Sequence, residues 1–293
     1  MRLSSIVYIE LYKIFRKPRT YIAFGAIAAI VGLIQLGFYA DGESYMKFGM
    51  QSLSDSFDVN GNIMNGYLMA FIILQTLLVH VPLLIALVAG DMISGEANQG
   101  TLRLLLTKPV SRANLITGKF IASSIYTIVL LLWMAVWALA ISILIFGADD
   151  MLIMKSDMVT QILASDVLWR YVAAFVFAAL AMLAVSALSF FLSIFAENSI
   201  GPIMATMSII IVFTILNTLD LPIFNMVKPY LFTSHMLGWK GFFDVTVNEN
   251  NEQITGSVEN LPAVLLSAGV LFLHIIGFLF ASILVFKRKD ILS

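Results

Sequence analysis

Two glycines in the stretch GEANQGTLRLLLTKPVSR, residues 95–112, have the spacing with which a phosphate-binding P-loop begins. In a P-loop, Gly-x4-Gly is followed by a lysine that reaches the β- and γ-phosphates and by a Ser or Thr that holds Mg²⁺. Here Gly95 and Gly100 are followed by Thr101 and Leu102, and no strand-like segment precedes them. Because the lysine is missing, we expect no nucleotide site within this chain.

Other catalytic patterns are also missing from the sequence. It contains no His-Glu-x-x-His and no Gly-x-Ser-x-Gly, the patterns of zinc peptidases and of serine hydrolases. The histidines His80, His235 and His274 lack the spacing of metal ligands, and there is no cysteine. Asp91 has no second aspartate within a span to form a catalytic pair. We therefore predict that the chain is not an enzyme and has no catalytic residue, metal or cofactor of its own.

The elements that surround these residues are predicted to be membrane helices. Of the 293 residues, 60% are hydrophobic and 12% are charged, and the mean hydropathy is +0.95. In soluble domains about 45–50% of the residues are apolar and about 25% are charged. A membrane helix needs about 20 apolar residues. We predict an all-α integral membrane protein, a single domain over residues 1–293. Its expected spans are about 21–40, 67–90, 118–146, 170–195, 200–219 and 262–286.

The distribution of Lys and Arg predicts the orientation of the chain. These residues gather before the first span, in the 91–119 region and after the last span, whereas the opposite loops are acidic. Since positively charged loops stay in the cytoplasm, we expect both termini, the 91–117 loop and the 196–199 turn to be cytoplasmic, in an inner or plasma membrane. The net charge of −1 gives no reason to expect a nucleic-acid partner.

Residues 3–17 have the periodicity of an amphipathic helix. Its apolar face is Leu3, Val7, Leu11, Ile14 and Phe15, and its basic face is Arg2, Lys13, Arg16 and Lys17. Ile6, Ile9 and Glu10 do not fit this division. We predict an interfacial helix with its apolar face in the acyl boundary and its basic face toward anionic headgroups, ended by Pro18. An ordinary basic anchor that only sets topology is the alternative.

Two other regions leave alternatives open. Residues 221–243, within the 220–261 loop expected outside the cytoplasm, are too apolar for a simple loop, and their prolines and glycines prevent one continuous span. A re-entrant or interfacial hairpin is predicted, with its backbone buried in protein. The small residues of the fourth span fit either internal packing or a dimer face. They are Ala173, Ala174, Ala178, Ala179, Ala181 and Ala184.

Polar residues inside spans are costly in lipid and are often functional. Gln75 and His80 lie in the second span and His274 in the sixth, and hydrogen bonds between packed helices are the favoured interpretation for each. Pro82 predicts a kink in the second span or a break that faces a substrate. The sequence identifies no substrate-binding residue.

The stretch 95–112 fits a docking element better than a nucleotide site. Gly95 and Gly100 are predicted to break the second span and reverse the chain, and Thr101 is a suitable N-cap. A short helix then ends before Pro109, and Ser111 caps the next one. The apolar face of the short helix is Leu102, Leu105 and Leu106. Because so short a helix is unstable alone, it must pack either on this chain's own helix ends or on a cytoplasmic partner.

The segment GDMISGEANQGTLRLLLTKPVSRANLITGKF, residues 90–120, strongly resembles the loop between spans two and three of ABC-2 type transporter permeases. The matching residues are Gly90, Asp91, Ser94, Gly95, Glu96, Gly100, Thr101, Leu102, Arg103, Leu105, Leu106, Pro109, Ser111, Arg112, Gly118 and Lys119. The basic N-terminal helix, the six spans and the ending FKRKDI agree. The chain is similar to the branch that includes the permease for copper-site maturation of nitrous oxide reductase and related drug or sodium exporters.

The resemblance implies the permease subunit of an ABC transporter, with export as the expected direction. In this family the loop is a coupling helix seated in a separate ATPase, which binds ATP and Mg²⁺. Two ATPase copies and a second permease, identical or paralogous, are the implied partners within the lipid bilayer. Glu96 and Arg103 would make polar contacts with the ATPase surface. The leucines of the short helix would make the apolar contact with it. The implied coupling residues are Glu96, Gly100, Thr101, Leu102, Arg103, Leu105, Leu106 and Pro109, with Glu197 and Asn198 in a second contact.

Two other functions compete with this interpretation. A passive channel or an ion-coupled secondary transporter predicts several charged residues within the spans, and the sequence has almost none there. A membrane scaffold without transport activity has no need of the specific 90–120 segment. The identity of the substrate is open in every case.

Overall fold

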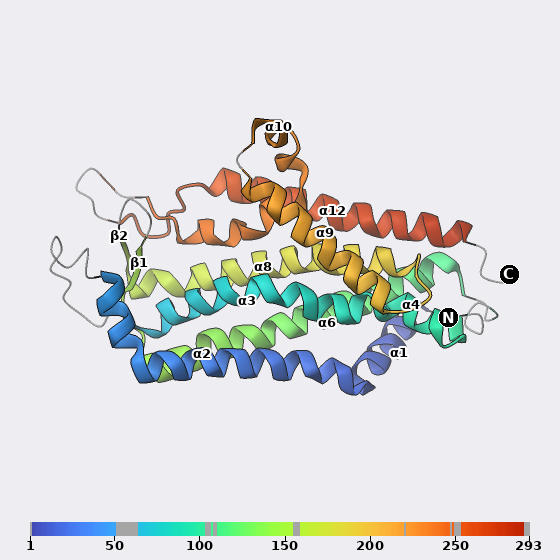
Figure 1. Cartoon of the computed structure of the whole chain (residues 1–293), viewed down its shortest axis with the longest axis horizontal. Helices are drawn as coiled ribbons and strands as arrows, with labels where there is room; N and C mark the ends of the chain where they lie inside the picture. Colours follow the sequence, from blue (N-terminus) through green and yellow to red (C-terminus); the bar gives the residue numbers. More distant parts are fainter. Residues whose placement is uncertain are drawn as a thin grey trace.

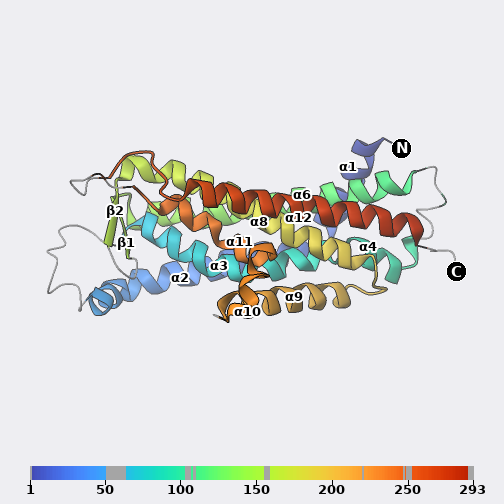
Figure 2. The same cartoon turned by 90° about the horizontal axis from the view of Figure 1, so that it is seen from above.

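The computed structural model describes residues 2–50, 64–102, 107, 110–154, 159–219, 221–246, 248 and 253–289. The described chain is a bundle of long helices that run along one axis (Figure 1). The first and the last helix bring their terminal ends to one end of the bundle, and a small β-hairpin lies at the other (Figures 1 and 2). We call these the termini end and the hairpin end.

The helices and strands follow one another in chain order. The first half contains α1 Leu3–Arg16, α2 Pro18–Met50, α3 Gly66–Ala89, α4 Asp91–Asn98, α6 Arg112–Ala135, the π-helical η1 Val136–Ile141 and α7 Ser142–Phe146. The second half contains β1 Met151–Met154, β2 Val159–Ile162, α8 Ala164–Ser193, α9 Ile200–Thr218, α10 Pro222–Asn225, η2 Lys228–Tyr230, α11 Phe232–His235, η3 Met236–Phe243 and α12 Leu261–Arg288.

Six helical segments of the described chain are long and apolar enough to cross a membrane, which confirms the predicted spans. They are Pro18–Gly42, Gly66–Asn98, Arg112–Phe146, Ala164–Ser193, Ile200–Thr218 and Leu261–Arg288. Several begin or end beyond the predicted limits, because a helix continues past its apolar stretch as long as caps and ion pairs satisfy its ends. The predicted 91–117 loop is therefore shorter, since α4 and α6 occupy both of its ends.

Helix α8 forms the centre of the bundle. It contacts α3, α6, α9, α12 and η3, and more of its span is buried than that of any other helix described. Ala174, Ala178, Ala181 and Ala184 are fully buried within the chain. These four alanines therefore serve internal packing, where a small side chain lets helix backbones approach closely.

The third span contains a π-helical segment, η1, which the sequence did not indicate. A π-turn leaves backbone carbonyls without their usual helical partner. The buried side chain of Gln35 on α2 compensates here, because its Nε2 donates to the Trp137 carbonyl at 3.0 Å and to the Ser142 hydroxyl at 2.9 Å. Gln35 thereby joins the first span to the third.

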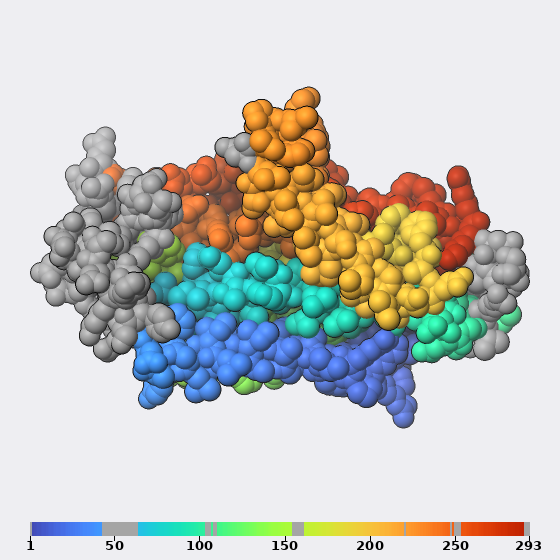
Figure 3. All heavy atoms as spheres, in the orientation of Figure 1, coloured from blue at the N-terminus to red at the C-terminus, as the bar shows by residue number. Residues whose placement is uncertain are grey.

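The hairpin end carries two short strands, and the segment before the last span contains short helical pieces. β1 and β2 pair antiparallel, with Met151 opposite Ile162, in a region where the sequence predicted only a loop. The 221–243 segment is broken into α10, η2, α11 and η3, as its prolines and glycines require. Trp239 and Phe243 are buried in the bundle, whereas α10 stands out from its side (Figures 1 and 3). The predicted burial of this backbone in protein thus applies to η3 but not to α10.

Helix α1 turns a different face to the protein than its apolar pattern predicts. Its buried residues are Ile6, Glu10 and Ile14, and two of these are the residues that did not fit the amphipathic division. The basic residues Lys13 and Lys17 are paired with carboxylates of this chain, so their charges are already balanced within the protein, and the interfacial helix stays a prediction. The buried face was missed because ion pairs, and not apolar side chains alone, line it.

Candidate functional site

The chain reverses between α4 and α6 at Gly100, as predicted. Gly100 has a φ of +69°, the left-handed conformation that glycine adopts just beyond a helix end. Gly95 does not break the helix; it lies inside α4, where a Cβ would collide with the carboxylate of Asp91. Gly95 therefore makes room for Asp91, and Gly100 alone of the two makes the turn.

The predicted docking helix falls largely outside the described residues. Thr101 is described, and its hydroxyl donates to the carbonyl of Glu96 at 3.3 Å, which ties the turn back to α4. Leu102 is buried in this chain, which favours intramolecular packing for that one leucine. The other predicted docking residues lie outside the described residues: Arg103, Leu105, Leu106 and Pro109.

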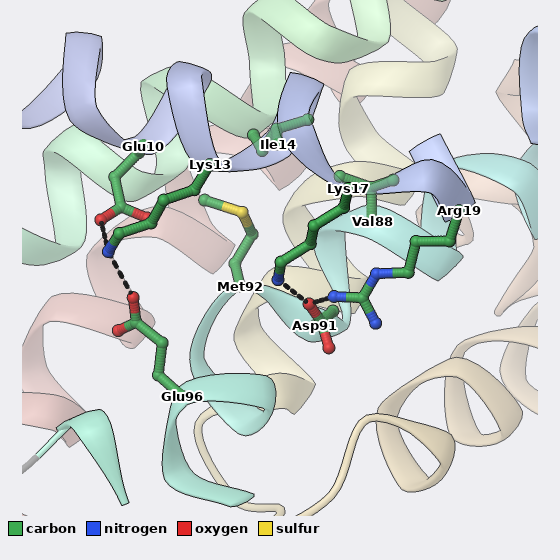
Figure 4. Close-up of a pocket in the computed structure, with 9 residues that line it drawn as sticks. All are labelled: Glu10, Lys13, Ile14, Lys17, Arg19, Val88, Asp91, Met92 and Glu96. Carbon is green, nitrogen blue, oxygen red and sulfur yellow. Dashed lines mark hydrogen bonds and ion pairs between the residues drawn. The ribbon is translucent and has the colours of Figure 1, made fainter. Parts of the chain in front are cut away.

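Four charged side chains from three helices meet at the base of this turn. Glu10 and Lys13 come from α1, Glu96 from α4 and Lys119 from α6. The Nζ of Lys13 lies 2.8 Å from Glu10 Oε1 and 2.8 Å from Glu96 Oε1 (Figure 4). The Nζ of Lys119 lies 2.8 Å from Glu10 Oε2 and 2.8 Å from Glu96 Oε2. Two carboxylates and two ammonium groups thus alternate, and their charges cancel.

A second charged group centres on Asp91, one residue after Gly90. Its carboxylate pairs with Lys17 Nζ at 2.9 Å and with the guanidinium of Arg19 (Figure 4). The hydroxyl of Ser199 donates to its other oxygen. Asp91 therefore joins α4 to the α1–α2 junction and to the turn before α9. We call Glu10, Lys13, Lys17, Arg19, Asp91, Glu96 and Lys119 together the ion-paired base.

The pKa values of Lys13 and Lys17 shift in opposite directions, although burial tends to lower both. Burial tends to lower the pKa of Lys13, but hydrogen bonds to Glu10 and Glu96 outweigh it and raise that pKa above its usual value. The pKa of Lys17 is lowered by burial and by the nearby positive charge of Arg19. Lys13 is therefore held firmly in its charged form within the ion-paired base.

The close approach of helices around these charges depends on a glycine. A Cβ at Gly118 of α6 would lie 2.6 Å from Ile6 Cγ2 of α1, which is too close for real atoms. Gly118 thus lets α1 and α6 approach until Lys119 reaches Glu10. The Gly-Lys pair at the end of the 90–120 segment serves this contact within the chain.

Arg112 of the segment and Lys289 after the last span fasten other helices at the termini end. Nη1 of Arg112, at the start of α6, donates to the carbonyls of Phe286, Lys287 and Lys289 at 3.3, 3.1 and 2.8 Å, so it caps the end of α12. Nζ of Lys289 donates to the Ile194 carbonyl at 2.6 Å, at the end of α8. Four helix ends, those of α4, α6, α8 and α12, are therefore held by side chains.

The predicted coupling residues have different surroundings. Glu96 turns inward to Lys13 and Lys119, which gives its carboxylate a role within the chain. Glu197 and Asn198 are exposed in the turn before α9, where Asn198 Oδ1 accepts from the Gly201 amide at 3.1 Å. Because Ser199 contacts Asp91, this turn lies beside α4. The structure thus brings the second predicted contact next to the first.

Of the ion-paired base, sequence reasoning named only Glu96 as a site residue and missed the other six: Glu10, Lys13, Lys17, Arg19, Asp91 and Lys119. Glu10 gave one usable signal, since it is the single carboxylate within a basic segment and interrupts its apolar pattern. Each carboxylate of the ion-paired base is paired with a Lys or Arg side chain from another helix or from the α1–α2 junction. Within the part of the chain that the structure describes, no three His, Cys, Asp or Glu residues are grouped so that they could hold a metal ion. The site therefore holds helices in place.

Comparison with known proteins agrees with this organisation. The sequence pattern of ABC-2 family transporter proteins matches residues 4–291. A segment of 69 residues is 41% identical to the probable ABC transporter permease protein NosY of Stutzerimonas stutzeri, and it covers 23% of this chain and 25% of that relative's length. The family match runs from α1 to beyond α12 and includes the whole ion-paired base. The chain therefore belongs to the ABC-2 family of transporter proteins.

Proposed function

We propose that this protein is the permease subunit of an ABC exporter, driven by a separate ATPase that docks where the chain passes from α4 to α6. The observation that carries the proposal is the ion-paired base beneath this connection. Asp91 and Glu96 hold α4, while Lys119 and Arg112 hold α6. A docking segment mounted in this way cannot shift without moving the helices to which it is fastened.

The ion-paired base suits the transmission of force. Packed helices move as rigid bodies when a load is applied to one of them. Here a displacement of the connection between α4 and α6 is passed to α1 through Glu10 and Lys13. It is passed to the junction between α1 and α2 through Lys17. Because Gly100 is not followed by a P-loop lysine, the energy for such a movement comes from a partner that binds ATP and Mg²⁺.

The proposed docking surface consists of exposed polar residues at the end of α4 and in the neighbouring turn. Asn98, Gln99 and Gly100 are exposed at the end of α4, and Glu197 and Asn198 are exposed in the turn before α9. The contact between Asp91 and Ser199 holds the turn before α9 beside the start of α4. We propose that all five face the ATPase on the cytoplasmic side, as the distribution of Lys and Arg predicts.

An exposed polar face of α3 supports a transport path shared with a second permease copy. Gln75, Thr76 and His80 are exposed on α3, and part of the surface of α3 is visible between α2 and α9 (Figure 3). Thr76 and His80 turn to carbonyls of their own helix at 2.9 and 2.8 Å, and no hydrogen bond of Gln75 is found among the described residues. Since polar groups that face lipid are costly, we propose that this face borders the path between two copies.

The experiment that tests the proposed function is purification of the tagged chain from its native membrane in mild detergent, with mass spectrometry of the proteins that accompany it. The expected result is a stoichiometric soluble protein with a complete P-loop. If the chain is folded and intact but reproducibly without an ATPase, the proposal fails, and the channel or scaffold functions become the better explanations.

A further inference from the structure

The outer face of α1 is aromatic and open, whereas its inner face is charged. Tyr8 is 71% exposed and Tyr12 is 54% exposed. Together with Leu11, Phe15 and Arg16 they line a groove of about 530 Å³. A helix in water places charges outside and apolar groups inside. The reversed arrangement of α1 indicates that the medium on its outer face is lipid.

Arg16 is the cation of this groove and differs from its neighbours in having no acidic partner. Lys13, Lys17 and Arg19 all pair with carboxylates of the chain. Among the residues that the structure describes, the guanidinium of Arg16 contacts only the Tyr12 side chain, by a hydrogen bond to the hydroxyl and by stacking 5.4 Å from the ring centroid. Its charge is therefore available to an anion from outside the chain.

The position of the groove matches the headgroup level of a membrane. It lies at the junction between α1 and the first span, where the exposed Tyr21 donates its hydroxyl hydrogen to the Phe15 carbonyl at 2.8 Å. Tyrosines are enriched at this level because one side of the ring is apolar and the hydroxyl reaches water. Tyr8, Tyr12 and Tyr21 thus mark the interface beside Arg16.

A row of aromatic rings continues from the groove along the seam between α2 and α6. The ring centroids of Phe15 and Tyr126 are 6.3 Å apart, those of Tyr126 and Phe24 are 6.1 Å apart, and those of Phe24 and Trp133 are 6.1 Å apart. Trp133 donates to the Phe24 carbonyl at 3.0 Å and is 36% exposed. This seam offers an acyl chain an apolar surface that begins beneath the cation.

We propose that this groove binds one anionic phospholipid, with its phosphate on Arg16 and the Tyr12 hydroxyl and an acyl chain along Phe15, Phe24 and Trp133. A guanidinium matches a phosphate in charge and in hydrogen-bond geometry. A zwitterionic phospholipid carries its own cation beside the phosphate and gains less from Arg16. The site does not depend on the ATPase or on the transported substrate.

The test uses the full chain in lipid nanodiscs that contain either brominated phosphatidylglycerol or brominated phosphatidylcholine. Bromine quenches tryptophan fluorescence on contact, and Trp133→Phe identifies the share of the signal that comes from the seam. We expect phosphatidylglycerol to be preferred at Trp133 by about fivefold, the effect of one basic residue at an anionic membrane surface. Arg16→Gln should abolish this preference, and Arg16→Lys should retain part of it.

The matched control is Arg288→Gln, which removes an exposed arginine at the same end of the bundle, on α12. It should leave the preference at Trp133 unchanged. Equal quenching by the two lipids in the wild-type protein, as expected if a second copy of the chain covers this face, overturns the proposal. An unchanged preference in the Arg16→Gln variant overturns it as well.

Discussion

The hairpin end and the termini end both bury a cation against carboxylates, but the partners come from different places. At the hairpin end, Arg170 and Asp166 lie one turn apart on α8, with Nη2 and Oδ2 2.6 Å apart. Most of their other hydrogen bonds are to backbone groups: Arg170 donates to the carbonyls of Phe242 in η3 and Ser257 in the following loop, and Asp166 accepts from the amide of Gly256. At the termini end, most ion pairs join one helix to another through side chains alone.

Because of this difference, we expect the cluster at the hairpin end to affect the stability of the fold, and the ion-paired base to affect the relative position of helices as well. The Arg170 cluster fastens η3 and the following loop to α8, so its loss should destabilise the fold without changing how the helices lie at the other end. The ion-paired base fixes α1, α4 and α6 relative to one another, so its loss should also change the position of the proposed docking surface.

The first prediction concerns Arg170→Met. It leaves the buried Asp166 without its cation and two carbonyls without a donor, which should lower the free energy of unfolding by about 3–5 kcal/mol. The measurement is a denaturing-detergent titration followed by circular dichroism. In the fraction that remains folded, ATPase assembly should equal that of the wild type. A stability loss below about 1 kcal/mol contradicts the role of this cluster.

The second prediction concerns Lys119→Met. The change removes a buried cation from Glu10 and Glu96 but leaves Lys13 paired with both, so the expected loss of stability is smaller, about 3 kcal/mol. Unlike Arg170→Met, it should also reduce ATPase assembly in the folded fraction, measured by co-purification. Arg288→Gln is the control for loss of an exposed charge. Normal assembly in folded Lys119→Met protein would mean that the base does not position the docking surface.

The third prediction is a pair of double-mutant cycles. Glu10→Gln combined with Lys119→Met should lose less stability than the sum of the single changes, with a coupling of about 1–3 kcal/mol, because the two side chains contact each other. Glu10→Gln combined with Arg170→Met should be additive within about 0.5 kcal/mol, because the two sites lie at opposite ends. Equal coupling in the two cycles would remove the distinction between the ends.

The fourth prediction concerns Lys17→Met. The Lys17 side chain is 40% exposed, and Arg19 still pairs with Asp91 after the change. The expected loss of stability is therefore at most about 1 kcal/mol, and it should shrink further at high salt in the same detergent titration. A loss as large as that of Lys119→Met would show that Asp91 depends on both cations.

The membrane helices could be predicted from the sequence because apolar length alone determines a span. The reversal at Gly100 and the cap at Ser111 could also be predicted, since both depend on local backbone chemistry; Ser111 Oγ accepts from the Asn114 amide at 3.2 Å. The β-hairpin and the π-helical η1 could not, because strand pairing and the contact with Gln35 join residues distant in the sequence.

The members of the candidate site could be predicted only in part. The 90–120 segment was identified, but Glu96 was assigned to a partner protein and Lys119 was given no role, because both depend on α1, which supplies Lys13 and Glu10 as their partners. A helical projection sorts residues into apolar and polar faces, so it placed Glu10 on no face at all. Which lysine meets which carboxylate depends on the approach of α1 to α6 at Gly118, and this approach is a property of the packed bundle.

The central claim is that the connection between α4 and α6 docks a separate ATPase. Its most direct test is a photo-crosslinking amino acid in place of Gln99, with the same substitution at Gln161 on the hairpin end as the control; both side chains are exposed. After irradiation of native membranes, we expect position 99 to crosslink to a protein with a complete P-loop and position 161 not to do so. No ATPase crosslink at position 99, in protein that is folded and inserted, would contradict the claim.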